Sequence, residues 1–262
     1  MRFKITGRCI GLLCFCLLFF QSCSTDKLPL STQSSLPQTE LSYYSDSFDS
    51  LKDDLWDPAG FVFSSAQLGS IKIGEMSIEA GKLRIETKTG GFSKAGLVSK
   101  FALRGDYTVQ IDLQIDFIPI EFDMDQVFGI GAVEKSAIGD FDRFISIGLN
   151  KKANSANKYL FSGYRSRGNR YHTGFSRQIK NFNGSVRMIR IGDQVVTYFR
   201  ETNQNRWSKM CTLPSSQKDT FIGFALQNFT SDRMSIEAHR SIRAWIDNFK
   251  IIAAHEIIES EI

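Results

Sequence analysis

The sequence runs Tyr107-Thr108-Val109-Gln110-Ile111-Asp112-Leu113-Gln114-Ile115-Asp116 near the middle of the chain. Apolar side chains stand at every second position of this stretch, and mostly polar side chains stand between them. Because successive side chains of a β-strand point to opposite faces, this alternation predicts a strand with one buried face. Similar short apolar runs recur along the chain, over residues 82–87, 126–133, 144–149, 186–191, 195–200, 221–227 and 244–252.

Turn-forming residues separate these runs, and Gly192-Asp193 lies directly between two of them, which predicts a tight hairpin. The chain has 262 residues, of which 42% are hydrophobic, and this is enough for one large core. A charged fraction of 23% argues against both a disordered chain and a membrane protein with many spans. We therefore predict an all-β protein, an antiparallel β-sandwich or jelly roll formed by residues 45–255, with residues 256–262 as a frayed tail.

The first 22 residues have the composition of an export signal. Basic residues precede an apolar run over residues 9–20, which is shorter than the roughly 20 residues of a membrane-spanning helix. Ser22-Cys23 resembles a bacterial lipobox, in which the cysteine after the cleavage point is acylated. Cleavage within Ser22-Cys23-Ser24 by an ordinary signal peptidase is the alternative.

These features predict a lipoprotein signal over residues 1–22 and a lipid anchor, such as palmitate, on Cys23. Residues 23–44 are rich in Ser, Thr, Gln and Pro, which predicts a flexible tether between the anchor and the folded domain. We expect a location in the bacterial cell envelope, at the outer membrane or the cell surface.

The net charge of +4 overstates how basic the exported protein is, because three of the positive charges lie in the predicted signal. A chain that is close to neutral after cleavage lacks the basic surplus typical of nucleic-acid-binding proteins. We predict no nucleic-acid partner.

Four segments, in the same order along the chain, resemble motifs of the concanavalin A-like lectin/glucanase domains. They are Asp46-Ser47-Phe48-Asp49 with Trp56, the stretch Gly105-Asp106-Tyr107-Thr108-Val109, the hairpin over residues 187–195 followed by Trp207, and Trp245-Ile246-Asp247-Asn248-Phe249-Lys250-Ile251. The resemblance implies two curved antiparallel sheets and a concave face that often holds carbohydrate.

The resemblance also raises the question of catalysis. The glucanase branch uses a Glu-x-Asp-x-Glu cluster on one strand, and the nearest match here is Glu121-Phe122-Asp123-Met124-Asp125. Asp125 replaces the last Glu, and the segment follows Pro119 between two predicted strands. Glu121, Asp123 and Asp125 are therefore catalytic candidates only if the protein is a glycoside hydrolase. The alternatives are a solvated acidic loop and a calcium loop, and enzymatic activity stays open.

Basic residues and aromatics alternate in Tyr164-Arg165-Ser166-Arg167-Gly168-Asn169-Arg170-Tyr171-His172, within a basic region over residues 143–192. Aromatic faces stack on sugars, and Arg binds sulfate, carboxylate or phosphate in a bidentate manner. The alternative is that these bases pair with the acidic residues of neighbouring strands. The candidate ligand-binding residues are Tyr164, Arg165, Arg167, Arg170, Tyr171 and Trp207.

Asp247, in the predicted last strand, is the candidate ligand of a structural calcium ion, as the resemblance implies. The alternative is that Asp247 only accepts hydrogen bonds from the first strand. Taken together, the sequence predicts a non-catalytic, lectin-like lipoprotein that binds a glycan, an anionic polysaccharide or a surface partner. A glycoside hydrolase of the same fold and a structural lipoprotein without a small ligand are the alternatives.

Overall fold

A computed structural model describes residues 34–58, 72–90, 93–117, 124–135, 142–153, 155–230 and 240–259. The predicted export signal and Cys23 lie outside these residues, as do Glu121 and Asp123 of the acidic segment. Among the described residues, no helix is long and apolar enough to cross a bilayer.

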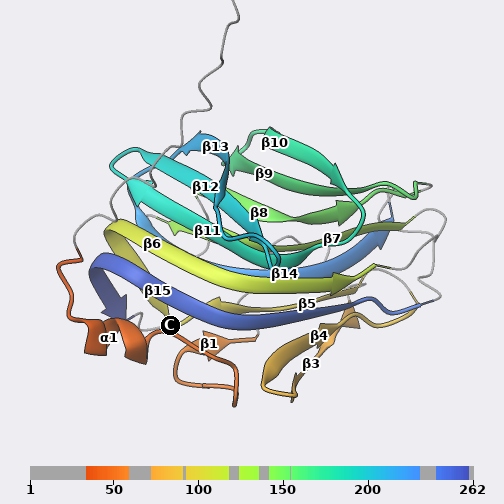
Figure 1. Cartoon of the computed structure of the whole chain (residues 1–262), viewed down its shortest axis with the longest axis horizontal. Coiled ribbons are helices and arrows are strands. Elements are labelled where there is room, and N and C mark those ends of the chain that lie inside the picture. Colours follow the sequence, from red (N-terminus) through yellow and green to blue (C-terminus); the bar gives the residue numbers. More distant parts are fainter. Residues whose placement is uncertain are drawn as a thin grey trace, which may run out of the picture.

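The described strands form two layers that pack face to face (Figure 1). The first layer runs β10-β9-β8-β7-β14-β5, and the short strands β1 and β2 pair with β5. The bounds are β1 (Trp56–Asp57), β2 (Lys72–Ile73), β5 (Ser93–Ser99), β7 (Met124–Lys135), β8 (Arg143–Lys151), β9 (Lys158–Ser166), β10 (His172–Ile179) and β14 (Asp219–Thr230).

The second layer runs β13-β12-β11-β6-β15-β4-β3. Its strands are β3 (Glu75–Glu79), β4 (Lys82–Glu86), β6 (Phe101–Asp116), β11 (Asn183–Ile191), β12 (Gln194–Glu201), β13 (Ser208–Pro214) and β15 (Arg243–Glu259). Every described pairing is antiparallel except that of β2 with β5. The predicted all-β antiparallel sandwich is therefore confirmed, as is the hairpin at residues 192–193, which joins β11 to β12.

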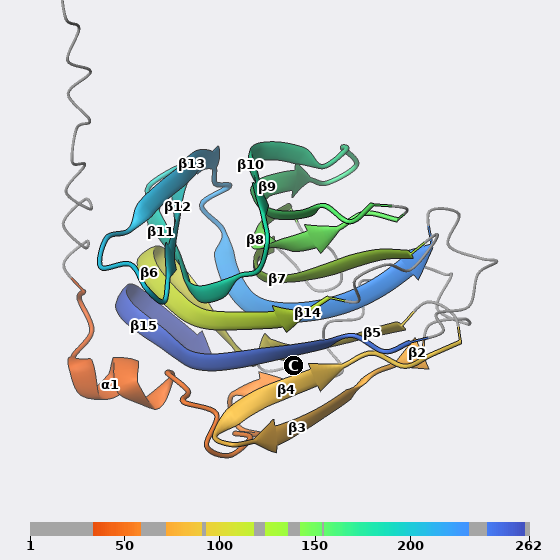
Figure 2. The same ribbon diagram turned by 45° about the vertical axis from the view of Figure 1, so that its right-hand side comes forward.

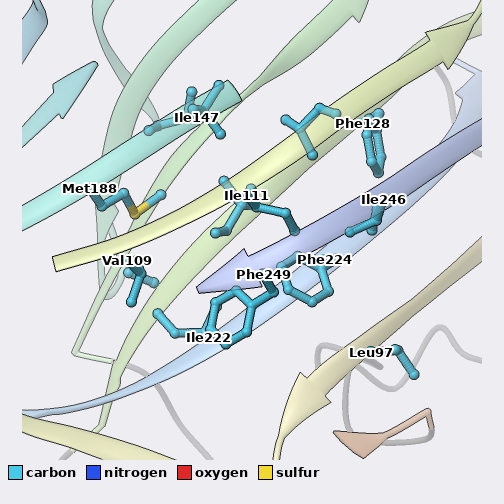
Figure 3. Packing of buried hydrophobic residues seen from close by; sticks show 14 of the residues in the cluster. Leu97, Val109, Ile111, Phe128, Ile147, Met188, Ile222, Phe224, Ile246 and Phe249 are labelled. Carbon is cyan, nitrogen blue, oxygen red and sulfur yellow. The ribbon is translucent and has the colours of Figure 1, made fainter. Parts of the chain in front are cut away.

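The core lies between the layers and is built by the alternation seen in the sequence. In β7 the inward side chains Phe128 and Ile130 are buried, and in β6 the inward side chains Val109 and Ile111 are buried as well. Figure 3 shows Val109, Ile111 and Phe128 with core side chains of other strands, among them Phe224 of β14 and Ile246 of β15. Burying a side chain of this size is worth about 1.5–3 kcal/mol, so the alternation is the main source of stability.

The first and last sequence motifs meet in the structure. Asp46 is 2% exposed, and its carboxylate accepts hydrogen bonds from the Trp56 Nε1–H (2.8 Å) and the Phe48 N–H (2.8 Å). The Asp46 N–H donates to the Phe249 carbonyl of β15 (2.9 Å). The Trp56 ring packs 5.3 Å from the Phe249 ring and 5.1 Å from the Phe224 ring. These contacts fasten the start of the fold to its last strand and to both layers.

Two predicted boundaries are wrong. The flexible tether was expected to reach residue 44, but α1 (Gln38–Tyr43) lies beside β15, and Leu41 and Tyr44 are part of the core (Figures 1 and 2). The tail was expected to fray from residue 256, but β15 pairs with β6 as far as Glu259. Helix α1 and the end of β15 are ordered for the same reason. Leu41 of α1 is part of the core, and Ile257 of β15 packs against it.

A buried guanidinium joins the two layers where β14 of one meets β6 of the other, at the pair Thr220 and Leu103. Arg190 of β11 is 1% exposed and donates to the Lys218 carbonyl (2.7 Å) and the Thr220 Oγ1 (2.8 Å). Its Nε also donates to the Gly105 carbonyl (2.5 Å) in β6.

The buried carboxylate that faces this guanidinium is held as well. Glu134 of β7 lies 3.9 Å from Arg190 and is 0% exposed. Its oxygens accept hydrogen bonds from the Ser215 hydroxyl, the Ser216 hydroxyl (2.6 Å) and the Ser216 N–H (2.6 Å). These hydrogen bonds remain when Arg190 is removed, but Glu134 then loses the opposite charge that lies 3.9 Å away in the interior.

We expect Arg190→Leu to lower the free energy of unfolding by about 3–5 kcal/mol, because it leaves the Glu134 charge buried and the junction carbonyls without a donor. Urea denaturation followed by circular dichroism measures this loss. The control is Arg243→Leu, because Arg243 is half exposed and its ion pair with Glu86 is worth about 1 kcal/mol or less. Equal losses in the two variants would contradict a joining role for Arg190.

Candidate functional site

A groove of about 700 Å³ runs over the outward face of the first layer. Strands β7, β8, β9, β10 and β14, which lie side by side in Figure 2, supply its lining. The residues that line it are Val127, Gly129, Ile130, Gly131, Phe144, Ser146, Asn150, Lys152, Tyr159, Phe161, Tyr171, Thr173, Ser176, Ala225 and Gln227. This volume lies within the range of small-ligand sites in proteins.

The floor of the groove is made of very small residues. In β7, Gly129 pairs with Gly148 of β8 and Ala225 of β14, and Gly131 pairs with Gly223 of β14. A Cβ atom on Gly129 would lie 2.6 Å from the Ile147 carbonyl oxygen, which is closer than a side chain allows. Glycine inside a strand weakens the strand, and it marks places where another group approaches the backbone closely.

The approaching groups here are aromatic rings. A Cβ atom on Gly131 would lie 2.9 Å from the Phe144 Cζ, and one on Gly163 would lie 2.7 Å from the Tyr171 hydroxyl. A Cβ atom on Gly148 would lie 3.1 Å from the Phe161 ring. Because these glycines have no side chains, the aromatic rings can lie directly against the sheet, and the rings then line the groove.

Tyr171 is fixed across the groove. Its hydroxyl forms a hydrogen bond with the Ser146 Oγ (2.7 Å), and its ring packs edge to face with Phe161 at 6.2 Å. The side chain is still 38% exposed. Burial of the hydroxyl raises the pKa of Tyr171 above its ordinary value, so the phenol stays neutral at physiological pH. A rigid, neutral, amphipathic ring is thus presented to a ligand.

The polar groups of the groove lie around these rings. Asn150, Gln227, Thr173 and Ser176 supply amide and hydroxyl groups that can donate and accept hydrogen bonds. Lys152 supplies the positive charge at one end. None of the described lining residues is an Asp or a Glu.

Asp125 is the one acidic candidate among the described residues, and it is not among the described residues that line the groove. Asp125 is 9% exposed and accepts hydrogen bonds from the Ala153 N–H (2.8 Å) and the Lys152 Nζ (3.1 Å). These bonds hold the β8–β9 connection to β7. Glu121 and Asp123 lie outside the described residues.

The predicted ligand-binding residues are divided among several places. Tyr171 alone among them lines the groove. Tyr164 packs against the core and stacks on His172 at 5.2 Å. Arg165, Arg167 and Arg170 lie at and beside the exposed β9–β10 turn.

Trp207 lies in the other layer. Its ring stands between the guanidinium groups of Arg187 (4.2 Å) and Arg200 (4.8 Å). Burial and the neighbouring Arg200 lower the pKa of Arg187. This stack is a second aromatic and basic feature, separate from the groove.

Asp247 lies on β15 opposite Asp112 of β6. Both Asp112 oxygens already accept hydrogen bonds, from the Ser185 hydroxyl (2.6 Å) and the Asn248 Nδ2 (3.2 Å). The described residues contain no group of three or more His, Cys, Asp or Glu side chains that could hold a metal ion. Calcium takes six to eight oxygen ligands, so the side chains described around Asp247 do not by themselves fit this ion. Calcium binding there stays a prediction.

Comparison with known proteins rests on structure, because no family model and no curated protein matches the sequence. The CBM2 module of the evolved Dit of Lactobacillus casei BL23 phage J-1 has a TM-score of 0.55 and 10% identity, covering 81% of this chain and 96% of that one. LamAcat from Zobellia galactanivorans has a TM-score of 0.52 and 13% identity, covering 79% and 95%.

A third structure is the GH16 protein of the Bacteroides ovatus mixed linkage glucan PUL, with a product bound. It has a TM-score of 0.54 and 9% identity, covering 79% of this chain and 99% of that one. The chain has the concanavalin A-like jelly-roll fold. At such low identities the likeness concerns the fold alone, and function has to be argued from the site.

Within this concanavalin A-like sandwich, sequence reasoning missed the groove residues Phe144, Tyr159 and Phe161 and the glycine floor. A signal for them was present. Gly129 and Gly131 alternate with the large apolar residues Phe128 and Ile130 in a predicted strand. Paired glycines on the outward face of a strand indicate a surface over which other groups lie closely.

We expect Gly131→Ala to displace the Phe144 ring, because the three atoms nearest to the new methyl group all belong to that ring. Gly129→Ala instead meets the β8 backbone, so it should lower the free energy of unfolding by about 1–3 kcal/mol. Urea denaturation of both variants measures the difference, with Gly131→Ala the less destabilised. The reverse order would contradict the arrangement of rings over glycines.

Proposed function

We propose that this protein is a non-catalytic, lectin-like carbohydrate-binding protein and that the aromatic groove of the first layer is its binding site. The observation that carries the proposal is the composition of the groove. The groove is lined by aromatic rings, by glycines and by amide and hydroxyl groups, and the described lining residues include no acidic side chain. The aromatic residues are Phe144, Tyr159, Phe161 and Tyr171.

This composition fits the chemistry of a sugar. A pyranose ring has faces of C–H groups that pack on aromatic rings, and its edge carries hydroxyls that need hydrogen-bond partners. Asn150 and Gln227 can each donate and accept at the same time, as a sugar hydroxyl does. The groove has a volume of about 700 Å³, which is within the range of small-ligand sites, so it has room for a saccharide.

The structural neighbours support the choice of ligand class. One is described as a CBM2 module, and the Bacteroides ovatus protein was solved with a product of mixed linkage glucan. The same fold thus serves proteins concerned with polysaccharides. Because the fold alone does not assign a function, the groove chemistry remains the main argument.

Hydrolysis by Glu121, Asp123 and Asp125 is less well supported. Glycoside hydrolases place two carboxyl groups about 5–9.5 Å apart across the bond that is cleaved. Asp125 is nearly buried and is engaged by Lys152 and the Ala153 N–H. Binding without cleavage is therefore our conclusion, and a structural lipoprotein without a small ligand is an outcome of the test below.

We expect Tyr171→Ala and Phe161→Ala each to weaken glycan binding at least about tenfold, which corresponds to about 1.4 kcal/mol. A glycan array identifies the ligand, and isothermal titration calorimetry measures the affinity. The control is Tyr43→Ala, since Tyr43 is 53% exposed on α1, away from the groove. An array without any hits would contradict the proposal, and release of reducing ends from a bound glycan would favour the hydrolase.

We also propose that a lipid on Cys23 holds the domain at a membrane of the cell envelope. The proposal is supported by the sequence of residues 1–23. The described residues begin at Ser34, so ten residues lie between Cys23 and the described part of the fold. Even fully extended, they reach no more than about 40 Å, which keeps the sandwich close to the bilayer.

We expect Cys23→Ser to move the protein from the membrane fraction to the soluble fraction of the cells, because the residue that carries the acyl chains is lost. Fractionation followed by immunoblotting measures the distribution. The control is Cys211→Ser, which removes the free thiol of the folded domain and keeps the anchor. Membrane retention of the Cys23→Ser variant would contradict lipid anchoring.

A further inference from the structure

A second groove, of about 480 Å³, lies on the outward face of the second layer. Strands β4, β6, β11 and β15 form its floor, and the turn after β12 forms one side. Since the core lies between the two layers, this groove opens on the opposite side of the molecule from the aromatic groove. Its chemistry differs as well, because most of its lining side chains are polar.

Two neighbouring carboxylates, those of Asp112 and Asp247, line this groove. Asp112 is held by the Ser185 hydroxyl (2.6 Å) and the Asn248 amide (3.2 Å), which fix its orientation. Asp247 stands across from it on β15, and burial raises the pKa of Asp247 above the ordinary value. The Asp247 carboxylate is therefore partly withdrawn from water, so it would gain from a ligand that donates hydrogen bonds.

An aromatic surface and several amides surround these carboxylates. Trp245 is half-buried and lines the groove two residues before Asp247, on the same face of β15. Gln114 lies next to Trp245 across the β6–β15 pair, and Asn205 lines the groove from the β12–β13 connection. Arg200, which also packs on Trp207, and Lys82 line the groove as well, so its described lining carries two positive and two negative side chains.

We propose that this groove is a second saccharide-binding site, specific for a neutral sugar. Trp245 would cover the C–H face of the sugar, and Asp247 would accept hydrogen bonds from its hydroxyls. The two carboxylates are balanced by Lys82 and Arg200, which favours an uncharged ligand, and the polar lining opposes an apolar one. Two sites on opposite faces would let one molecule hold two glycan chains, which raises overall avidity.

The chain offers a direct probe of this site. It has three tryptophans: Trp56 is buried in the core, Trp207 lies between two arginines, and Trp245 lies in the second groove. The aromatic groove has no tryptophan among its described residues. The indole N–H signals in a nitrogen–proton correlation spectrum, assigned with Trp207→Phe and Trp245→Phe, therefore distinguish the two grooves.

The experiment titrates the full chain, in detergent, with the methyl glycosides of glucose, galactose, mannose and N-acetylglucosamine. We expect at least one of them to shift the Trp245 indole signal saturably and to leave the Trp56 signal in place. Asp247→Asn should weaken that binding at least about tenfold. Asp193→Asn, an exposed hairpin aspartate outside the groove, is the matched control and should leave the affinity unchanged.

Three results would overturn the proposal. One is the absence of any Trp245 shift up to about 50 mM sugar, far above a millimolar Kd. Another is a shift that Asp247→Asn leaves unchanged. The last is a shift that Tyr171→Ala abolishes, because the sugar would then occupy the aromatic groove. The spectra of the variants show at the same time whether each is folded.

Discussion

The sandwich depends on one buried guanidinium at the place where its two layers join. Arg190 reaches from the second layer to the backbone of β6 and to the Thr220 hydroxyl of β14, with Glu134 facing it from β7. A charge is stable in such a place only when donors and acceptors surround it. The position of this residue therefore fixes how the layers meet, and the apolar faces of both layers can then be buried against each other.

The inward faces of both layers are apolar because they form the core, whereas the outward faces of the two layers carry different side chains. The first layer presents glycines at alternate positions of β7 and neighbouring strands, and aromatic rings lie against them. The second layer presents carboxylates, amides and Trp245 instead. The same strand alternation thus builds one core and two surfaces of contrasting chemistry. We propose that both surfaces bind sugars, the first through its aromatic rings and the second through Trp245 and hydrogen bonds.

The known structures with this fold illustrate why the surfaces matter more than the scaffold. Proteins about 10% identical to this chain share its layers, although one is called a CBM2 module and another is a GH16 protein with a product bound. The layers are common to both, so the side chains on the outward faces must make the difference. In the described groove of this chain those side chains are aromatic and amide groups, not carboxylates.

The sequence by itself determined the fold class, the hairpin at residues 192–193 and the approximate place of eight strands. The strands could be located because the alternation of apolar and polar residues is a local property, and successive side chains of a strand point to opposite faces. It also identified Tyr171 as a binding candidate. Only the tertiary structure decided that Tyr171 lies with Phe144 and Phe161, while Tyr164 faces the core and Trp207 lies in the other layer. Which residues share a groove depends on strand order and register, which are long-range pairings that no single stretch of sequence encodes.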